Sequence, residues 1–299
     1  MVRESLKTLL AGCLLLFFLA SCSTGGRNGK LPKSTGMPYE VVLEGDTDSI
    51  VTKMLTEDVT GLPQPEPLCR LIQVKKGKTR GNYLLVRTRI VVNIGERDFS
   101  VTLHHDENAA PQNIIRITAQ SAQQLRERLS GERLRQIVDE VELKHLADII
   151  SGNPSKQNKK MQDEIKKMFG IDMKIPAAMN ASKKAKDFIW ISNNASSGMQ
   201  NLLVFKVKSE HQIDSILRTN MPGETDSMYM VIPHLSERGL WEMKGDAMGG
   251  PYVMHRIHRQ TSQAAKQGYN LYIIAFVYAP EMKKKILIKQ LEAAISTIK

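Results

Sequence analysis

An apolar run near the start of the chain, from Leu9 to Ala20, is the feature that most constrains its fold. The run follows two cations, Arg3 and Lys7, and has the length of a signal-peptide core, which is too short to cross a bilayer. No later stretch reaches the roughly 20 apolar residues that a membrane-spanning helix requires. We therefore expect the rest of the chain to bury its apolar side chains in a globular body.

The tetrapeptide that ends this run, Leu19-Ala20-Ser21-Cys22, resembles the lipobox of bacterial lipoproteins. Small residues before the cysteine let a peptidase approach the backbone, and the thiol can carry a diacylglyceryl group. We therefore expect residues 1–21 to be a lipoprotein signal peptide and Cys22 to be the lipidated first residue of the mature chain. The alternative is an ordinary secretory signal in which the cysteine is incidental.

The cysteines and the residues after the lipobox indicate a compartment. Cys13 leaves with the signal peptide and Cys22 is lipidated, so Cys69 alone remains and no internal disulfide can form. Ser23 stands where an aspartate would favour the inner membrane of enteric bacteria, and residues 23–30 contain no acidic cluster that would favour surface export. These features predict a protein that is lipid-anchored to the outer membrane and faces the periplasm.

The formal net charge is +11, but the cations are spread along the chain. Nucleic-acid binding requires a basic face with aromatic platforms or a known motif, and aromatic residues make up only 5% of the chain. We therefore expect no nucleic-acid partner and assign most lysines to solvated helix faces. A weak attraction to anionic phospholipid or lipopolysaccharide is the second interpretation. The basic positions include Lys75-Lys76, Lys78, Arg80, Lys159-Lys160, Lys166-Lys167, Lys183-Lys184 and Lys283-Lys284-Lys285.

Shifts in composition divide the mature chain into two lobes. Polar residues over 22–38 predict a flexible tether, and Gly, Asn, Pro and Lys over 151–160 predict an internal boundary. The N-terminal lobe then covers residues 39–150 and the C-terminal lobe residues 161–299. Each lobe is predicted to end in an apolar strand followed at once by an amphipathic helix. The expected fold class is α+β, with two related lobes of mostly antiparallel sheet.

Hydrophobic periodicity places individual elements in both lobes. Ser121 and Gln124 have the spacing of a capping box, and Ser130-Gly131 should interrupt the helix that follows. Strands are predicted over residues 39–43, 83–94 (as one strand or a pair), 113–118, 188–192, 202–207, 252–258 and 271–278. Helices are predicted over residues 46–57, 121–150 and 213–217, with a last helix starting at Pro280.

Three longer motifs carry a family resemblance. They are Leu-Pro-Lys-Ser-Thr-Gly-Met-Pro-Tyr-Glu-Val at 31–41, Gly-Leu-Pro-Gln-Pro-Glu-Pro at 61–67 and Gly-Leu-Trp-Glu-Met-Lys-Gly-Asp-Ala-Met-Gly-Gly-Pro at 239–251. Together with the lipobox they resemble an uncharacterised lipoprotein family, domain of unknown function 4837, which is typical of Bacteroidetes. The resemblance spans nearly the whole mature chain. It implies an envelope location and a domain extent, and it implies no activity.

The last motif is also the strongest candidate for a ligand-binding loop. The common catalytic signatures, including H-E-x-x-H, G-x-S-x-G, the P-loop and C-x-x-C, are absent from the sequence, so the catalytic residues are unknown. Paired glycines expose backbone donors, while an indole, an ammonium group and a carboxylate nearby could contact a ligand. The alternative is a wide hairpin whose glycines serve geometry alone. The candidate ligand-binding residues are Trp241, Lys244, Asp246, Gly249 and Gly250.

The run of four residues at 104–107 has the composition of a metal site but not its geometry. Adjacent residues of a strand point to opposite faces, so these four could share an ion only in a loop. We therefore predict no metal and no other cofactor, and interpret the run as a solvated polar turn. His255, in a predicted strand with Val253 and Ile257 on the same face, is expected to be a half-buried core histidine. The weak metal candidates are His104, His105, Asp106 and Glu107.

The alternating prolines Pro63, Pro65 and Pro67 predict an extended or polyproline-II segment. Such a segment could present a stiff ligand to the groove of a partner protein. The alternative, which is more common, is a rigid surface connector.

Three Asp-Ser-apolar tripeptides resemble the O-glycosylation motif used in the periplasm of some Bacteroidetes. The acceptor residues would be Ser49, Ser215 and Ser227. The alternative is structural, because Asp48 and Asp214 also suit helix starts, where a carboxylate accepts free N–H groups.

The sequence therefore favours a non-catalytic envelope lipoprotein that acts as a binding or assembly module, with the membrane and an envelope protein as partners. The alternative is a lipid-anchored hydrolase whose site is built from non-contiguous residues. A deep cleft lined by several titratable groups would favour the hydrolase, and a flat apolar patch would favour the binding module.

Overall fold

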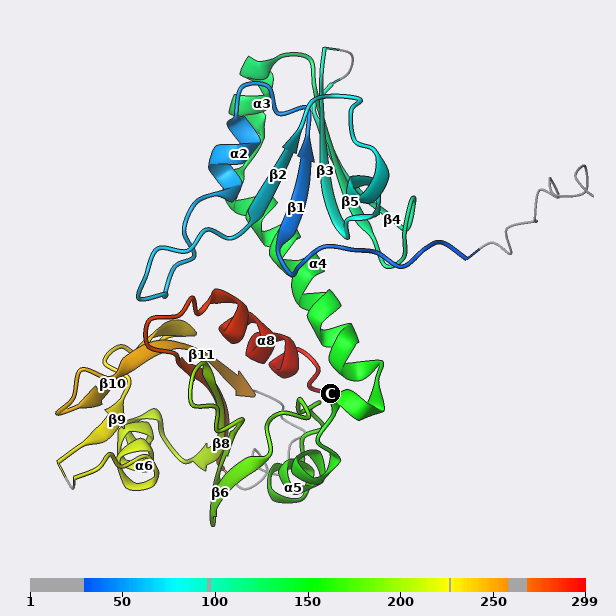
Figure 1. Ribbon diagram of the computed structural model, residues 1–299. Coiled ribbons are helices and arrows are strands. Elements are labelled where there is room, and N and C mark those ends of the chain that lie inside the picture. Colours follow the sequence, from blue (N-terminus) through cyan, green and yellow to red (C-terminus); the bar gives the residue numbers. More distant parts are fainter. Residues whose placement is uncertain (1–29, 96–97, 226, 258–267) are drawn as a thin grey trace, which may run out of the picture.

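The computed structural model describes residues 30–95, 98–225, 227–257 and 268–299, which form two lobes, each built on its own sheet (Figure 1). The predicted α+β class with two lobes is confirmed. The predicted signal peptide, the predicted lipidation site Cys22 and the last residue of the strand predicted over 252–258 lie outside the described residues. No described helix combines the length and the apolar character needed to span a bilayer.

The N-terminal lobe contains a five-stranded sheet with the order β2-β1-β3-β5-β4. Three of its four strand pairings are parallel, and only β4 runs antiparallel to its neighbour. The prediction of mostly antiparallel sheet is therefore wrong for this lobe, because helix α2 carries the chain back after β1 and makes β2 parallel to it. The strands are β1 (Glu40–Glu44), β2 (Arg70–Val74), β3 (Thr88–Ile94), β4 (Ser100–His105) and β5 (Asn113–Ala119).

Three helices pack on one face of this sheet: α2 (Ile50–Leu55), α3 (Ala122–Arg128) and α4 (Gly131–Ser151). The side chain of Ser121 accepts a hydrogen bond from the Gln124 N–H, and Ser130 caps α4 in the same way. The predicted N-cap at Ser121 and the break at Ser130 are thus confirmed. The core between helices and sheet includes Val41, Leu43, Ile90, Ile115, Leu134 and Val138.

The segment that precedes β1 is fixed to this lobe. The Ala110 N–H donates to the Pro32 carbonyl at 2.9 Å, and the Thr35 N–H donates to the Leu85 carbonyl at 2.8 Å. The prediction of a flexible tether is therefore wrong for residues 32–36, because their backbone groups pair with the lobe. Leu85 closes a 3₁₀ turn, η1 (Gly81–Leu85), where the sequence predicts a strand.

The C-terminal lobe contains a seven-stranded sheet with the order β6-β7-β8-β12-β11-β10-β9. All of its pairings are antiparallel, as predicted. The strands are β6 (Ala181–Ala185), β7 (Phe188–Ser192), β8 (Met199–Val207), β9 (Tyr229–Val231), β10 (Arg238–Lys244), β11 (Gly249–Ile257) and β12 (Asn270–Tyr278). The helical elements are η2 (Pro154–Lys156), α5 (Lys159–Phe169), η3 (Glu210–Gln212), α6 (Ile213–Asn220) and α8 (Lys285–Ile295).

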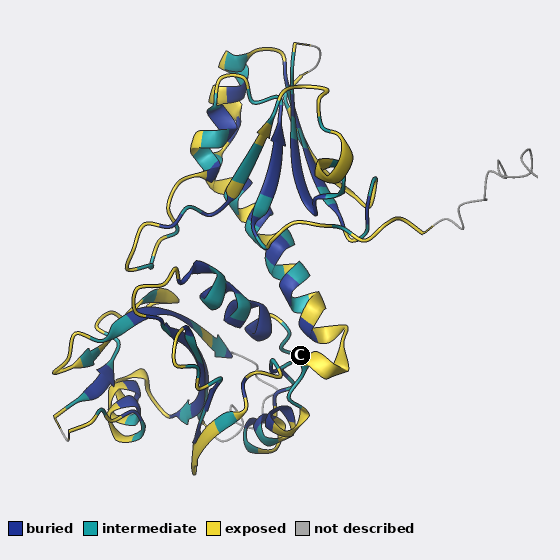
Figure 2. Cartoon of the chain, viewed as in Figure 1, coloured by how far each residue is buried: buried dark blue, intermediate teal, exposed yellow. Residues whose placement is uncertain are grey.

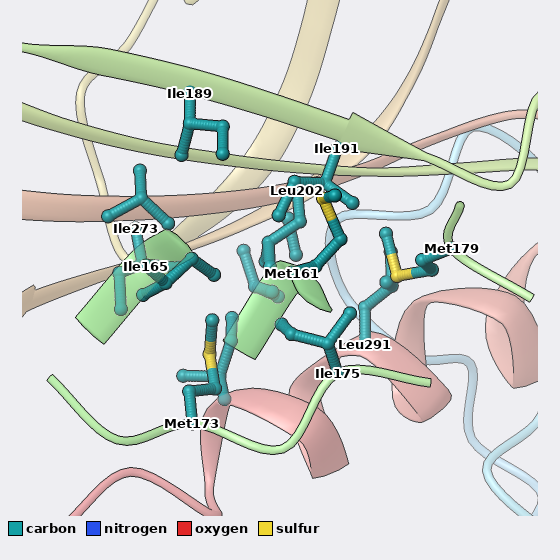
Figure 3. Packing of buried hydrophobic residues seen from close by; sticks show 14 of the residues in the cluster. Met161, Ile165, Met173, Ile175, Met179, Ile189, Ile191, Leu202, Ile273 and Leu291 are labelled. Atoms are coloured by element: carbon teal, nitrogen blue, oxygen red, sulfur yellow. The ribbon is translucent and has the colours of Figure 1, made fainter. Parts of the chain in front are cut away.

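Both faces of the seven-stranded sheet are buried. On one face, α5 and α8 pack on an aliphatic and methionine-rich core that includes Ile165, Ile191 and Leu291 (Figure 3). On the other face, α6 packs on an aromatic core that includes Phe205, Trp241 and Tyr272. Figure 2 shows the resulting band of buried residues along these strands and along the inner side of α8.

Helix α8 belongs to both lobes. Its residues Ile288, Leu291 and Ile295 pack in the core of the C-terminal lobe, whereas Ala293 is buried in the core of the N-terminal lobe and Ile286 packs against it. The long helix α4 descends from the upper lobe beside it (Figure 1). The two lobes are therefore joined by packing as well as by the chain.

Candidate functional site

The proline-rich segment meets the start of α8 between the lobes. Glu66 is buried, and its carboxylate accepts hydrogen bonds from the backbone N–H of Lys284 at 2.6 Å and of Lys285 at 3.3 Å. The Lys285 ammonium donates to the carbonyls of Pro67 and Leu68. Burial lowers the pKa of Lys285. The prolines thus hold Glu66 at the N-terminal end of α8, where a negative charge is stabilising.

A buried ion cluster continues along the same helix. The Lys289 side chain is only 2% exposed, and its ammonium lies 2.7 Å from Asp139 of α4 and 3.0 Å from Glu292. Tyr39 donates its hydroxyl proton to Asp139 at 2.6 Å. Burial, followed by the charge of Asp139, raises the pKa of Tyr39, so the phenol stays protonated. We call the contacts of Glu66, Lys285, Lys289, Asp139 and Tyr39 the interlobe joint.

Another buried carboxylate extends the joint into the N-terminal lobe. Glu142 of α4 is fully buried and accepts hydrogen bonds from the Tyr39 N–H at 2.9 Å and from the Thr88 hydroxyl. Arg87 lies beside it, and its guanidinium also contacts His145 at 2.7 Å. Burial, and then the charge of Arg87, lowers the pKa of His145 to about 4. The neutral imidazole can therefore accept a hydrogen bond from Arg87 at neutral pH.

A cavity of about 700 Å³ opens beside the joint, at the C-terminal end of α8. Leu143 of α4 contributes to its wall from the N-terminal lobe, and the remaining wall comes from the C-terminal lobe. We call it the interlobe cavity. Its polar and charged lining residues are Glu210, Ser236, Glu237, Arg238, His255, Arg256, Tyr272, Glu292 and Ser296.

The best-defined polar group in this cavity is centred on Glu210. Its carboxylate accepts a hydrogen bond from Arg256 at 2.7 Å and from the Tyr272 hydroxyl at 2.8 Å. Burial, followed by the hydrogen bond to Glu210, raises the pKa of Tyr272 to about 12. The phenol is therefore a hydrogen-bond donor at neutral pH and not a general base.

The serines of the cavity are bonded to the protein itself. The Ser296 hydroxyl donates to the Ala293 carbonyl at 2.8 Å, and the Ser236 hydroxyl donates to the Arg238 carbonyl. His255 is exposed in the cavity, so the prediction of a half-buried core histidine is wrong, because this part of β11 lines a hollow instead of packing under a helix. The cavity wall therefore presents hydrogen-bond donors and acceptors that contacts within the protein hold in place.

The structure separates the five residues of the predicted ligand-binding loop. Trp241 is 3% exposed and donates its indole N–H to the Val277 carbonyl at 3.1 Å, so it belongs to the aromatic core. A Cβ added at Gly250 would lie 2.1 Å from that same carbonyl oxygen, and one at Gly249 would lie 2.7 Å from the Trp241 carbonyl oxygen. Both glycines therefore allow close approach of the neighbouring strands.

The remaining candidates of that loop lie near the surface. The Lys244 ammonium lies over the ring of Tyr229, 5.6 Å from its centroid. Asp246 and Gly249 border a smaller hollow of about 440 Å³, together with Pro63 of the proline-rich segment. The 61–67 and 239–251 motifs thus meet between the lobes, where a Cβ added at Gly61 would lie 3.5 Å from the Gly239 nitrogen.

The four weak metal candidates do not form one ligand set, although His104 Nδ1 lies 3.7 Å from a carboxylate oxygen of Glu107. His104 and His105 lie at the end of β4, and His105 contacts Asn113 at 2.9 Å. Asp106 accepts from the Gln112 N–H, and Glu107 pairs with Arg116. Within the described ranges no three His, Cys, Asp or Glu side chains are grouped to hold a metal ion.

The three glycosylation candidates differ in accessibility. Ser215 on α6 and Ser227 are exposed, whereas Ser49 is partly buried at the start of α2. The carboxylate that accepts the free N–H groups of α2 is Asp46, through Val51 and Thr52, and Asp48 instead pairs with Arg126.

Comparisons with known proteins identify two domains. Residues 157–297 match the family described as domain of unknown function (DUF4837), and residues 34–151 match domain of unknown function (DUF8532). The resemblance to the first family is thus confirmed for the C-terminal lobe, and the N-terminal lobe matches a different family model. The chain therefore combines two domains of unknown function. No curated protein and no solved structure gave a significant match.

Sequence reasoning missed the residues of the joint and most of those of the cavity. Lys285 belongs to a lysine run that was assigned to a solvated helix face, yet it is buried. Glu210, Arg256 and Tyr272 come from three separate elements, so no local motif joins them. The one available signal was a set of polar residues, Arg256 and Tyr272, inside predicted apolar strands.

Proposed function

We propose that this protein is a lipid-anchored envelope protein that holds a ligand in the interlobe cavity and works as a binding or assembly module at the periplasmic face of the outer membrane. The lipobox residues Leu19 to Cys22 support the anchor. The interlobe cavity supports the binding role, because its donors and acceptors are already fixed by internal hydrogen bonds and ion pairs. The main observation that supports the proposal is the hydrogen-bonded group of Glu210, Arg256 and Tyr272.

The binding role is tested by crosslinking in intact cells. A photoreactive residue replaces Leu235, which is 43% exposed in the cavity wall, and a control places it at Leu103, which is 40% exposed on β4. We expect a discrete crosslinked species from position 235 that is lost when Arg256 is replaced by alanine. Equal crosslinking from both positions would contradict a ligand in the cavity.

The anchor is tested separately. The substitution Cys22→Ser removes the only thiol that the lipobox offers, so incorporation of radiolabelled palmitate should stop and the signal peptide should remain uncleaved. Cys69→Ser is the control and should label normally, because that thiol is buried within the N-terminal lobe. Undiminished labelling of the Cys22→Ser protein would contradict the anchor.

A second candidate function, a hydrolase, is favoured by one observation: Glu210, Glu237 and Glu292 line the same cavity. Two of these carboxylates are already ion-paired, Glu210 with Arg256 and Glu292 with Arg238. Glu237→Gln therefore separates the two functions. A binding module should keep its crosslink from position 235 and its biological activity, whereas a hydrolase that uses this carboxylate should keep the crosslink and lose activity.

A further inference from the structure

We propose that one edge of the N-terminal lobe lies against an anionic phospholipid surface. This edge, the anchor-proximal edge, consists of Lys30, Leu31, Lys33, Met37 and Tyr83. The inference rests on the proposed lipid anchor and specifies which part of the folded protein faces the bilayer.

The first support is the length of chain between the proposed anchor and the fold. Eight positions separate Cys22 from Lys30, and a fully extended chain spans about 3.5 Å per residue, so this stretch covers at most about 28 Å. The backbone is already bonded to the lobe at Pro32 and Thr35. An anchored protein therefore keeps this edge close to the membrane, whatever the orientation of the rest.

The second support is the apolar character of the edge. Leu31 is 40% exposed, Met37 is 65% exposed and Tyr83 is 46% exposed. These are three of the eight large apolar side chains that are exposed in the described part of the chain. They belong to two segments that touch, because the Thr35 N–H donates to the Leu85 carbonyl at 2.8 Å. Apolar groups with an aromatic side chain among them suit the headgroup region of a bilayer.

The third support is charge. The segments 30–39 and 81–86, which meet at Thr35 and Leu85, contain no aspartate or glutamate, and the first of them carries the exposed cations Lys30 and Lys33. A lysine or arginine near an anionic membrane is worth about 1 kcal/mol, which is about a fivefold change in partitioning. Exposed apolar side chains and exposed lysines on one edge are the combination that an anionic lipid surface recognises.

The test uses the chain from residue 22 with Cys22→Ser, which contains both lobes but cannot be acylated. Flotation with vesicles of phosphatidylglycerol and phosphatidylethanolamine measures partitioning without help from the anchor. Lys30→Ala with Lys33→Ala should reduce the partition coefficient about 25-fold, at about fivefold per lysine. Lys159→Ala with Lys160→Ala, an exposed pair in the C-terminal lobe, is the matched control and should change it little.

A second measurement locates the contact. Tyr83→Cys can be labelled selectively with an environment-sensitive dye, because Cys69 is only 2% exposed. Its emission should shift to the blue on adding the same vesicles, whereas a dye at Leu240→Cys, on β10 of the C-terminal lobe, should not shift. Equal effects of the two lysine pairs, or equal shifts at the two labelled positions, would overturn the proposal.

These outcomes are distinct from failure of the proposed function. If palmitate labelling of Cys22 succeeds and the vesicle experiments fail, the protein is anchored but this edge does not contact lipid. If labelling fails and the vesicle experiments succeed, the edge binds the surface without an anchor.

Discussion

The interlobe joint and the interlobe cavity lie along the same helix, α8, but they differ in how far their charged side chains are exposed to water. In the joint, the Glu66, Lys285 and Lys289 side chains are buried and Asp139 is partly buried, so that Lys289 lies between carboxylates of both lobes. In the cavity, Glu210 and Arg256 are partly exposed and pair within the C-terminal lobe. Water can therefore replace a partner that is lost from the cavity but not one that is lost from the joint.

This contrast assigns different roles to the two regions. Removing one member of a buried ion pair leaves an uncompensated charge and destabilises the fold, whereas exposed pairs contribute little to stability. We therefore expect the joint to fix the position of the lobes relative to each other. The charged side chains of the cavity should be free to exchange their ion-pair partners when a ligand binds. Four substitutions test this contrast, from the largest expected effect to the smallest.

The largest effect is expected for Lys289→Met. The substitution keeps the apolar stem but removes the cation of Asp139 and leaves Glu292 with Arg238 alone, which should cost about 3–5 kcal/mol of unfolding free energy. Urea unfolding followed by circular dichroism measures it. Lys184→Met, which breaks an exposed pair with Glu164, is the control and should cost below about 1 kcal/mol. An equally small loss of unfolding free energy for Lys289→Met would contradict the contrast between the buried joint and the exposed pairs.

A smaller loss is expected for Glu66→Gln. The amide keeps one oxygen as an acceptor for the N–H groups of Lys284 and Lys285 but loses the charge, which should cost about 1–3 kcal/mol. Glu132→Gln, an exposed residue in the first turn of α4, is the matched control. If both variants unfold at the same urea concentration, burial at the joint adds nothing to the charge of Glu66.

Acid should weaken the fold through His145. Its folded pKa of about 4 lies below the ordinary value of 6.5, so between these values the unfolded chain binds a proton that the folded chain does not. Stability from this group is complete above pH 6.5 and is lost as the pH falls toward 4. After discounting for partial exposure, the loss should be about 1–2 kcal/mol.

The variant that isolates this effect is His145→Gln, which keeps an acceptor for Arg87 but cannot be protonated. Unfolding free energies at pH 7 and pH 4.5 should differ less for the variant than for the wild type. Equal differences would show that other groups account for the acid dependence.

The smallest effect on stability is expected in the cavity. Arg256→Ala removes an ion pair at 2.7 Å between partly exposed groups, so the melting temperature should correspond to a loss below about 1 kcal/mol. The crosslink from position 235 should nevertheless disappear. A loss as large as that of Lys289→Met would mean that the pair of Glu210 and Arg256 supports the fold as strongly as the joint does.

Local pattern predicted strands with continuous apolar runs in both lobes, and it missed edge strands in both, including β6 and β9 of the C-terminal lobe. The strands over 188–192 and 271–278 have continuous apolar runs, and both are found close to their predicted bounds, because burial on two faces leaves a clear signal. β2 and β4 were missed, because edge strands with exposed residues lack that signal. The last helix starts at Lys285 instead of Pro280, since its N-terminal end is defined by Glu66 from the other lobe.

The residues of the site were harder to predict, because contacts between distant parts of the chain define them. The most distinctive motif residue, Trp241, proved to be a core side chain, and the charged side chains of the cavity come from distant elements. A buried lysine and a solvated one look alike in sequence. Lys289 is buried partly because it pairs with Asp139, which lies 150 positions away in the sequence.

The sharing of α8 between the lobes sets an order of events for the newborn chain. The first lobe lacks Ala293 and Ile286 until the last helix has been made, so the part of its core that α8 covers stays open to solvent while the second lobe is still being synthesised. A chaperone that shields exposed apolar surface would find a binding site on the first lobe throughout that interval. Packing of α8 against the first lobe would then cover this surface and release the chaperone. The interval of exposed apolar surface therefore ends with synthesis of the whole chain and not with that of either lobe.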